Sequence, residues 1–107
     1  MNFIDVYEND SGNLIDLPVA ATLRVILEEN PSTGYRWKVE DQSSGCLEMV
    51  SHEFYINNDH IVGAGGLVVF YFQPMKPGRC TLYLKLGRPW EGDKAITKRF
   101  RIAVFIR

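Results

Sequence analysis

Hydrophobic and polar residues alternate along most of this chain, and a period of two residues predicts β-strands rather than helices. The clearest case is Cys80–Leu86, where even-numbered positions are apolar and odd-numbered positions, apart from Tyr83, are polar. The last predicted strand, between 96 and 106, repeats the alternation, with Lys98 on the apolar parity and Phe105 on the polar one. No segment sustains a helical period, so the pattern predicts an all-β protein.

Turn-forming residues divide the rest of the chain into further strand-like runs. The run Leu67–Phe72 is apolar on both faces, as expected of a central strand. We therefore predict a single domain over residues 1–107, an immunoglobulin-like β-sandwich of about seven to eight antiparallel strands. The further runs are Asn2–Tyr7, Ala20–Glu28, Tyr35–Val39, Leu47–Ile56 and Leu67–Gln73.

Three connections of this predicted sandwich carry distinctive residues: Asn30–Tyr35, Gly63–Gly66 and Arg88–Trp90. They follow every second long strand in the predicted order. Alternate connections between antiparallel strands fall at the same end of a sandwich. The strand order therefore predicts that the three loops cluster at one edge, where they could contact a single partner.

The first loop combines a stiff backbone with polar side chains. Pro31 fixes φ and removes a backbone donor, and Gly34 can adopt a positive φ. Ser32 and Thr33 offer hydroxyls that donate and accept hydrogen bonds. Tyr35 leads into the next strand and is expected to anchor the loop. Taken alone, however, the segment is more typical of an ordinary turn than of a binding loop.

The second loop is rich in glycine. Gly63, Gly65 and Gly66 lack side chains, and only Ala64 interrupts them, so another backbone could approach closely. The lysine and the strand–helix context of a phosphate-binding loop are missing. We expect a flexible turn or an edge that offers main-chain hydrogen bonds.

The third loop presents two residue types that often dominate interfaces, Arg88 and Trp90, on either side of Pro89. A tryptophan here could also pack on the surface of its own domain. We expect Trp90 to serve binding. Trp37 lies in a predicted strand and is expected to be a core residue, as is common in sandwiches.

Charge and composition exclude several classes of partner. The net charge is −1, whereas nucleic-acid-binding domains are usually strongly basic. No apolar run approaches the length of a membrane span. The N-terminus resembles no signal peptide. We expect a monomer that is cytoplasmic as written, or periplasmic, lysosomal or secreted if a signal peptide has been removed.

The chain has two cysteines, Cys46 and Cys80. Small secreted scaffolds that depend on disulfides usually carry more. We expect two buried thiols, although a single bridge is possible, because the distance between the two residues cannot be read from the sequence.

Catalytic chemistry is poorly supported. The histidines, His52 and His60, do not form a recognised metal-binding spacing with Asp59. Ser51, His52 and Glu53 cannot act together on one strand, because neighbouring side chains point to opposite faces. We expect no cofactor, no metal and no enzymatic activity.

The three loop motifs together resemble the chagasin family of cysteine-peptidase inhibitors. Its pattern is Asn-Pro-Thr-Thr-Gly-aromatic, Gly-x-Gly-Gly and Arg-Pro-aromatic, in this order. The resemblance extends along the whole chain, with Ser32 in place of the family's usual Thr. It implies an immunoglobulin-like sandwich that reversibly inhibits papain-like cysteine peptidases. The implied contact residues are Asn30, Pro31, Ser32, Thr33, Gly34, Tyr35, Gly63, Ala64, Gly65, Gly66, Arg88, Pro89 and Trp90.

The resemblance also implies a role for each loop. Asn30–Tyr35 would form a central wedge over the catalytic cysteine of a peptidase, with Thr33 nearest to the catalytic dyad. Gly63–Gly66 would pair through its backbone with the non-primed wall of the cleft, and Arg88–Trp90 would cover the primed side. An adhesion or carbohydrate-binding module that uses the same loops remains an alternative, and a small enzyme is a weaker one.

Overall fold

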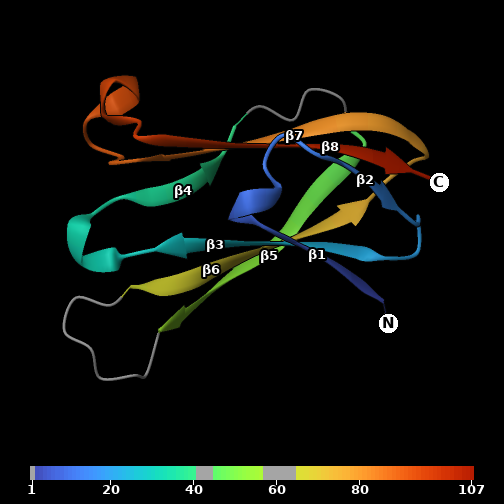
Figure 1. Ribbon diagram of the computed structural model, residues 1–107, viewed down its shortest axis with the longest axis horizontal. Coiled ribbons are helices and arrows are strands. Elements are labelled where there is room, and N and C mark those ends of the chain that lie inside the picture. Colours follow the sequence, from blue (N-terminus) through green and yellow to red (C-terminus); the bar gives the residue numbers. More distant parts are fainter. Residues whose placement is uncertain (1, 41–44, 57–64) are drawn as a thin grey trace.

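The computed structural model describes residues 2–40, 45–56 and 65–107 of the chain. Two four-stranded sheets pack face to face in it (Figure 1). One sheet, called sheet A here, has the strand order β1-β3-β6-β5, and sheet B has the order β2-β8-β7-β4. Sheet A contains β1 (Phe3–Tyr7), β3 (Thr22–Glu29), β6 (Gly66–Pro74) and β5 (Leu47–Ile56). Sheet B contains β2 (Leu14–Leu17), β8 (Lys98–Ile106), β7 (Gly78–Gly87) and β4 (Arg36–Val39).

The all-β sandwich predicted from the alternation is confirmed. The long strands pair antiparallel, but β1 runs parallel to β3, and β2 runs parallel to β8. After β1 the chain passes through the 3₁₀ turn η1 (Glu8–Asp10), adds β2 to sheet B, and returns to sheet A as β3. Because the chain crosses to sheet B and back between β1 and β3, these two strands run in the same direction. The sequence pattern missed β2, because four residues are too few to show a period.

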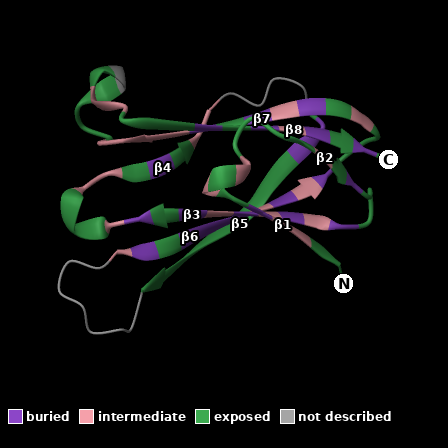
Figure 2. Ribbon diagram, in the orientation of Figure 1, coloured by how far each residue is buried: buried purple, intermediate pink, exposed green. Residues whose placement is uncertain are grey.

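The core lies between the sheets, where the inward-facing residues of each strand meet (Figure 2). On β7 and β8 the buried residues follow the predicted parity. β6 is central in its sheet, between β3 and β5, as its apolar pattern predicted. Full burial of a leucine or phenylalanine side chain contributes about 1.5–3 kcal/mol. Fully buried members of the core include Leu23, Val25, Leu27, Phe72, Leu82, Leu84, Phe100 and Ile102.

The two cysteines correct one expectation. Cys46 and Cys80 are buried as predicted, but they form a disulfide rather than two thiols, and their Cα atoms are 6.4 Å apart. Cys46 precedes β5 in sheet A, and Cys80 lies on the inner face of β7 in sheet B. The packing of one sheet on the other brings them together, and no local sequence signal records that contact.

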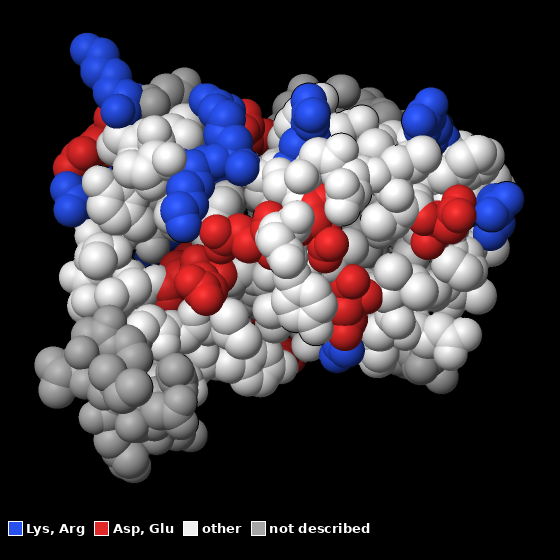
Figure 3. Space-filling view, viewed as in Figure 1, with Lys and Arg blue, Asp and Glu red and all other residues white. Residues whose placement is uncertain are grey.

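Charge is unevenly distributed between the two sheets. Lys and Arg side chains stand along the upper side of Figure 3, where Figure 1 places β7 and β8. Acidic groups form a band below them in the same view. Within the part of the chain that the structure describes, no helix is long and apolar enough to cross a membrane.

Candidate functional site: three loops at one end of the sandwich

The β3–β4 and β7–β8 connections lie at the same end of the sandwich, on the left of Figure 1. β5 ends and β6 begins at this end too, so the second motif is anchored beside the other two. The predicted clustering is therefore confirmed for the described residues. Gly63 and Ala64 lie outside them, whereas Gly65 and Gly66 are described. We call Asn30–Tyr35, Gly65–Gly66 and Arg88–Trp90 the loop edge.

The first loop folds around Asn30. Its Oδ1 atom accepts hydrogen bonds from the Ser32 amide (3.1 Å) and from the Ser32 hydroxyl (2.8 Å). Its carbonyl accepts the Thr33 hydroxyl at 2.8 Å. Asn30 thereby caps the short 3₁₀ turn η2 (Pro31–Thr33), which begins with proline. Both hydroxyl protons are used inside the loop, so Ser32 and Thr33 offer a partner mainly their acceptor lone pairs.

Gly34 and Trp90 join the first loop to the third. Gly34 has φ +79°, in the left-handed region that glycine enters without steric cost. A Cβ atom at this position would overlap the Trp90 ring, so the indole lies directly on the glycine backbone. Trp90 is nevertheless 69% exposed. The indole is therefore fixed on one side and open to a partner on the other.

Arg88 forms a second connection between these loops. Its Nε donates to the Thr33 carbonyl at 3.2 Å, and its guanidinium lies 4.5 Å from the centre of the Tyr35 ring. Glu91 holds the same guanidinium in an ion pair at 3.2 Å. The planar guanidinium suits both a hydrogen bond and stacking on an aromatic ring. Arg88 therefore orders the loop edge from within.

The second motif packs against the first through its glycines. A Cβ atom on Gly65 would come within 3.1 Å of Cα of Asn30 and 3.0 Å of the Glu29 carbonyl. A Cβ atom on Gly66 would overlap the backbone carbonyl of Tyr55 and the ring of Phe54 on β5. Gly66 therefore requires glycine, because β5 occupies the space of a side chain there, whereas a side chain at Gly65 would press on the neighbouring backbone.

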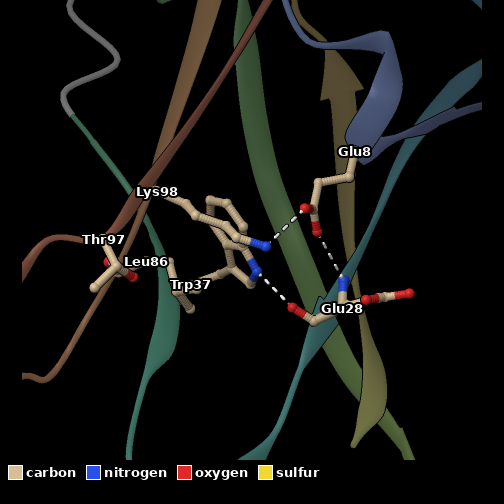
Figure 4. A network of polar contacts seen from close by, with 6 residues as sticks. All are labelled: Glu8, Glu28, Trp37, Leu86, Thr97 and Lys98. Atoms are coloured by element: carbon tan, nitrogen blue, oxygen red, sulfur yellow. Dashed lines mark hydrogen bonds and ion pairs between the residues drawn. The ribbon is translucent and has the colours of Figure 1, made fainter.

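A cleft of about 650 Å³ opens between the sheets below the loops. Figure 4 shows the polar network near it. Lys98 donates to Glu8 at 3.2 Å, Glu8 accepts the Glu28 amide at 3.4 Å, and the Trp37 indole donates to the Glu28 carbonyl at 2.8 Å. At the rim, a hydrogen bond to Glu53 raises the pKa of Tyr55 above its ordinary value. The network links η1, β3, β4 and β8, and so supports the base of the loops.

The described residues contain no cluster of three or more His, Cys, Asp or Glu side chains that could hold a metal ion. His52 stacks on the Phe70 ring with centroids 5.8 Å apart, which is a packing role. His60 and Asp59 lie outside the described residues.

Comparison with known proteins decides the family. The family described as Chagasin family peptidase inhibitor I42 matches residues 16–104. The chain belongs to the chagasin family of peptidase inhibitors. As a member of this family it is an inhibitor and not an enzyme.

Individual relatives agree with the family assignment. Amoebiasin-2 of Entamoeba histolytica is 31% identical over 88 residues, which cover 79% of this chain and 70% of the relative. Chagasin of Trypanosoma cruzi is 24% identical over 96 residues, which cover 86% and 87% of the two chains. The cysteine protease inhibitor EhICP2 of Entamoeba histolytica shares the fold, with a TM-score of 0.85, 22% identity and coverage of 99% and 96%.

This chagasin-family fold brings together the predicted site residues that the structure describes. It also separates two tryptophans as predicted, because Trp37 is buried at 6% exposure and Trp90 projects from the third loop. The contacts of the predicted site residues with a peptidase stay a prediction, including those of Gly63 and Ala64.

Sequence reasoning missed several residues that support the site. Glu29 is buried at 6% exposure, and its Oε1 accepts the Trp37 amide at 2.7 Å. It occupies the inward parity of β3, so a charged residue at a core position was a visible signal. Lys98 breaks the alternation of β8 in the sequence, but nothing in the sequence indicates that Glu8 is its partner. Glu91 gave no signal, because its role depends on the fold of the third loop.

Proposed function

We propose that this protein is a reversible, competitive and non-covalent inhibitor of papain-like cysteine peptidases, which it blocks with the loop edge. The observation that carries the proposal is the pairing of Trp90 with Gly34, together with the bond from Arg88 to Thr33. These contacts join two loops that are far apart in sequence into one continuous surface. That surface stands at one end of a rigid sandwich, as an insert into a cleft requires.

Preorganisation supports tight binding. Ordering a flexible side chain on association costs about 0.5–1.5 kcal/mol, and a preformed surface avoids much of this cost. The Asn30 hydrogen bonds, the proline of η2 and the Arg88 bridge are in place before a peptidase arrives. A protease–inhibitor interface buries about 800 Å² on each partner, which three adjacent loops could supply.

The three loops would divide the cleft as follows. The turn Asn30–Tyr35 would lie over the catalytic cysteine, with Thr33 closest to the catalytic dyad. The glycine motif would pair through its backbone with the non-primed wall. Trp90 would cover the primed side with its open indole face. Ser32 keeps a hydroxyl where the family usually has threonine, so the loss of a methyl group would affect affinity or selectivity rather than inhibitory activity itself.

The shape of the first loop would protect it from cleavage. Its Asn30 carbonyl accepts the Thr33 amide and hydroxyl, and its Pro31 carbonyl accepts the Gly34 amide. These bonds hold a closed turn. Peptide cleavage requires a scissile carbonyl aligned with the nucleophile at about 3–3.5 Å, and a constrained turn keeps its bonds out of that alignment.

We also propose that the protein works in an oxidising compartment such as the periplasm or the cell exterior. The buried Cys46–Cys80 disulfide supports this, because structural disulfides persist mainly in such environments.

The decisive test is a titration of papain and of a cathepsin L-like enzyme, with a fluorogenic peptide as substrate. We expect a rise in apparent KM without a change in kcat, and an intact inhibitor on a gel afterwards. Trp90→Ala should raise the inhibition constant about tenfold or more, as truncation of an interface anchor usually does.

Phe105→Ala is the matched control. Phe105 is also an exposed aromatic residue, at 42% exposure, but it lies on β8 away from the loops. It should inhibit like the wild type. If micromolar protein leaves both enzymes active, or if Trp90→Ala inhibits as well as the wild type, the proposed mode of binding is wrong.

A further inference from the structure

Strand β5 has a long open edge that the inhibitor role does not use. It is the last strand of sheet A and pairs with β6 on one side, and no described strand pairs with its other side. The other edge strands, β1, β2 and β4, have five, four and four residues, whereas β5 has ten. An edge leaves backbone N–H and C=O groups unpaired, and short edge strands limit that exposure. β5 is therefore the edge that is best able to pair with another strand.

The second half of β5 lacks the usual protection of an edge. A bulge interrupts its register with β6 between Met49 and Ser51, so the first half of the strand is irregular. From Ser51 to Ile56 the pairing with β6 is continuous. This segment contains neither lysine nor proline, the residues that commonly prevent edges from pairing. It therefore offers a regular template for one more strand.

Three consecutive apolar residues of this segment are exposed: Phe54, Tyr55 and Ile56. Phe54 lies opposite the buried Val68 of β6 and so shares the parity of the core, yet it is left exposed. Ile56 is 71% exposed, slightly more than Trp90. Figure 2 shows exposed residues along nearly the whole of β5. An exposed apolar run of this length usually marks a contact surface.

We propose that two copies of this chain associate through the second halves of their β5 strands, which pair antiparallel about a twofold axis. The unpaired backbone groups of an open edge are satisfied by another strand. A second copy supplies the same open edge, and a twofold interface requires one patch that is complementary to itself. The pairing would join the two A sheets into a single sheet and would cover the exposed apolar side chains.

The side chains of β5 favour one register for this pairing. Residues directly opposite each other in an antiparallel pair point to the same face, and like charges placed opposite destabilise the pair. A twofold axis at Glu53 would bring the two Glu53 carboxylates together. An axis at Phe54 avoids this and places Phe54 opposite its own copy, Glu53 opposite Tyr55 and His52 opposite Ile56. The Tyr55 hydroxyl donates to Glu53 within one chain, and the same pair can form between copies.

The register also affects the loop edge. Ile56 is the last residue of β5, and β5 ends beside the three motifs. The strand of the second copy would continue past Ile56 by the five residues Leu47–Ser51, or about 17 Å at 3.4 Å per residue. It would occupy space that a bound peptidase needs. Dimer formation and peptidase binding should therefore exclude each other; this consequence rests on the proposed function, whereas dimer formation itself does not.

Sedimentation equilibrium of the full chain between about 1 and 200 µM tests the association. So short a paired segment buries less than the roughly 800 Å² per partner of a stable complex, and we expect a dimer of micromolar affinity. The average mass should rise with concentration from that of one chain toward that of two. The monomer expected from the sequence would then persist at the nanomolar concentrations of an inhibition assay. The mass of one chain throughout, or growth beyond two chains, would overturn the proposal.

Tyr55→Glu and Tyr55→Lys form a matched pair of variants that tests the register. Both remove the same exposed aromatic ring and add one charge. In the proposed register the introduced carboxylate would face Glu53 of the second copy, at two places in the dimer, whereas the introduced ammonium would form an ion pair there. We expect Tyr55→Glu to dimerise at least tenfold more weakly than Tyr55→Lys. Equal affinities would show that the two strands do not meet in this way.

Phe54→Cys tests the position of the axis. The two copies of residue 54 would have Cα atoms about 4.5–5.5 Å apart, within the range of a disulfide. The two copies of residue 56 would be four residues apart along the strand, or about 14 Å. Mild oxidation should therefore link Phe54→Cys into a covalent dimer on a non-reducing gel and leave Ile56→Cys largely unlinked. Ile56 is the more exposed residue, so faster linking of Ile56→Cys would indicate random collision and contradict the axis.

Addition of papain to the dimer tests the mutual exclusion. An equimolar amount should convert the dimer into complexes of one inhibitor and one peptidase, as measured by mass. A complex that holds two inhibitors and two peptidases would overturn the register at Phe54. If papain does not bind at all, the proposed function fails, and the sedimentation result still decides whether the dimer exists.

Discussion

At the scale of single residues, the loop edge depends on small groups that let large ones approach. Gly34 is the clearest example, because it combines a positive φ with the Trp90 ring packed on its backbone. Gly66 similarly leaves space for Tyr55 and Phe54 of the neighbouring strand. In the first of these cases, Gly34 positions Trp90.

Gly34→Ala should therefore damage both stability and inhibition. A left-handed backbone costs a non-glycine residue about 1–2 kcal/mol, which chemical denaturation can measure. The new methyl group must also displace the indole, so the inhibition constant should rise about tenfold or more, equivalent to about 1.4 kcal/mol.

Gly12→Ala separates these two effects. Gly12 also has a positive φ, of +93°, but a Cβ atom there would meet nothing within 4 Å. This variant should lose a similar amount of stability and inhibit normally. Equal inhibition by the two variants would show that the position of Trp90 does not matter.

At the scale of elements, the loop edge is held by the strands that deliver it. β3 ends in the buried Glu29. Its carboxylate accepts a hydrogen bond from the backbone amide of Trp37, on the other side of the loop, at 2.7 Å. The Trp37 indole in turn donates to the Glu28 carbonyl at 2.8 Å. These two bonds fix the distance between the strands on either side of η2.

We expect Glu29→Ala to lower the free energy of unfolding by about 1–3 kcal/mol, because it leaves the buried Trp37 amide without its acceptor. Glu29→Gln keeps an acceptor oxygen and should lose much less. Urea unfolding monitored by tryptophan fluorescence measures both variants. If alanine and glutamine are equally tolerated, the carboxylate does not hold the loop.

At the scale of the whole molecule, the two sheets are joined by the core and by one covalent link. The Cys46–Cys80 disulfide closes a loop of 34 residues between sheet A and sheet B. Such a link lowers the entropy of the unfolded chain. It also lies near the opposite end of the sandwich from the three motifs, so it stabilises the scaffold and not the binding surface.

Replacing both cysteines by alanine should lower the free energy of unfolding by about 3–4 kcal/mol, as chain entropy predicts for a loop of this length. A small domain with 5–15 kcal/mol of stability would remain folded and still inhibit at 25 °C. Urea unfolding of the wild type with and without reductant provides an independent check. Identical midpoints in the two conditions would mean that the disulfide does not form or contributes nothing.

The sequence by itself determined the strands other than β2, the buried faces of β7 and β8, and the three motifs, because these depend on local period and turn chemistry. It also placed the motifs at one end, since alternate connections of an antiparallel sandwich must meet there. Only the tertiary structure decided which distant groups touch: Trp90 on Gly34, Arg88 on Thr33, Lys98 with Glu8, and Cys46 with Cys80. Each of these contacts joins segments whose separation is set by strand register and sheet packing, and neither quantity leaves a trace in local sequence.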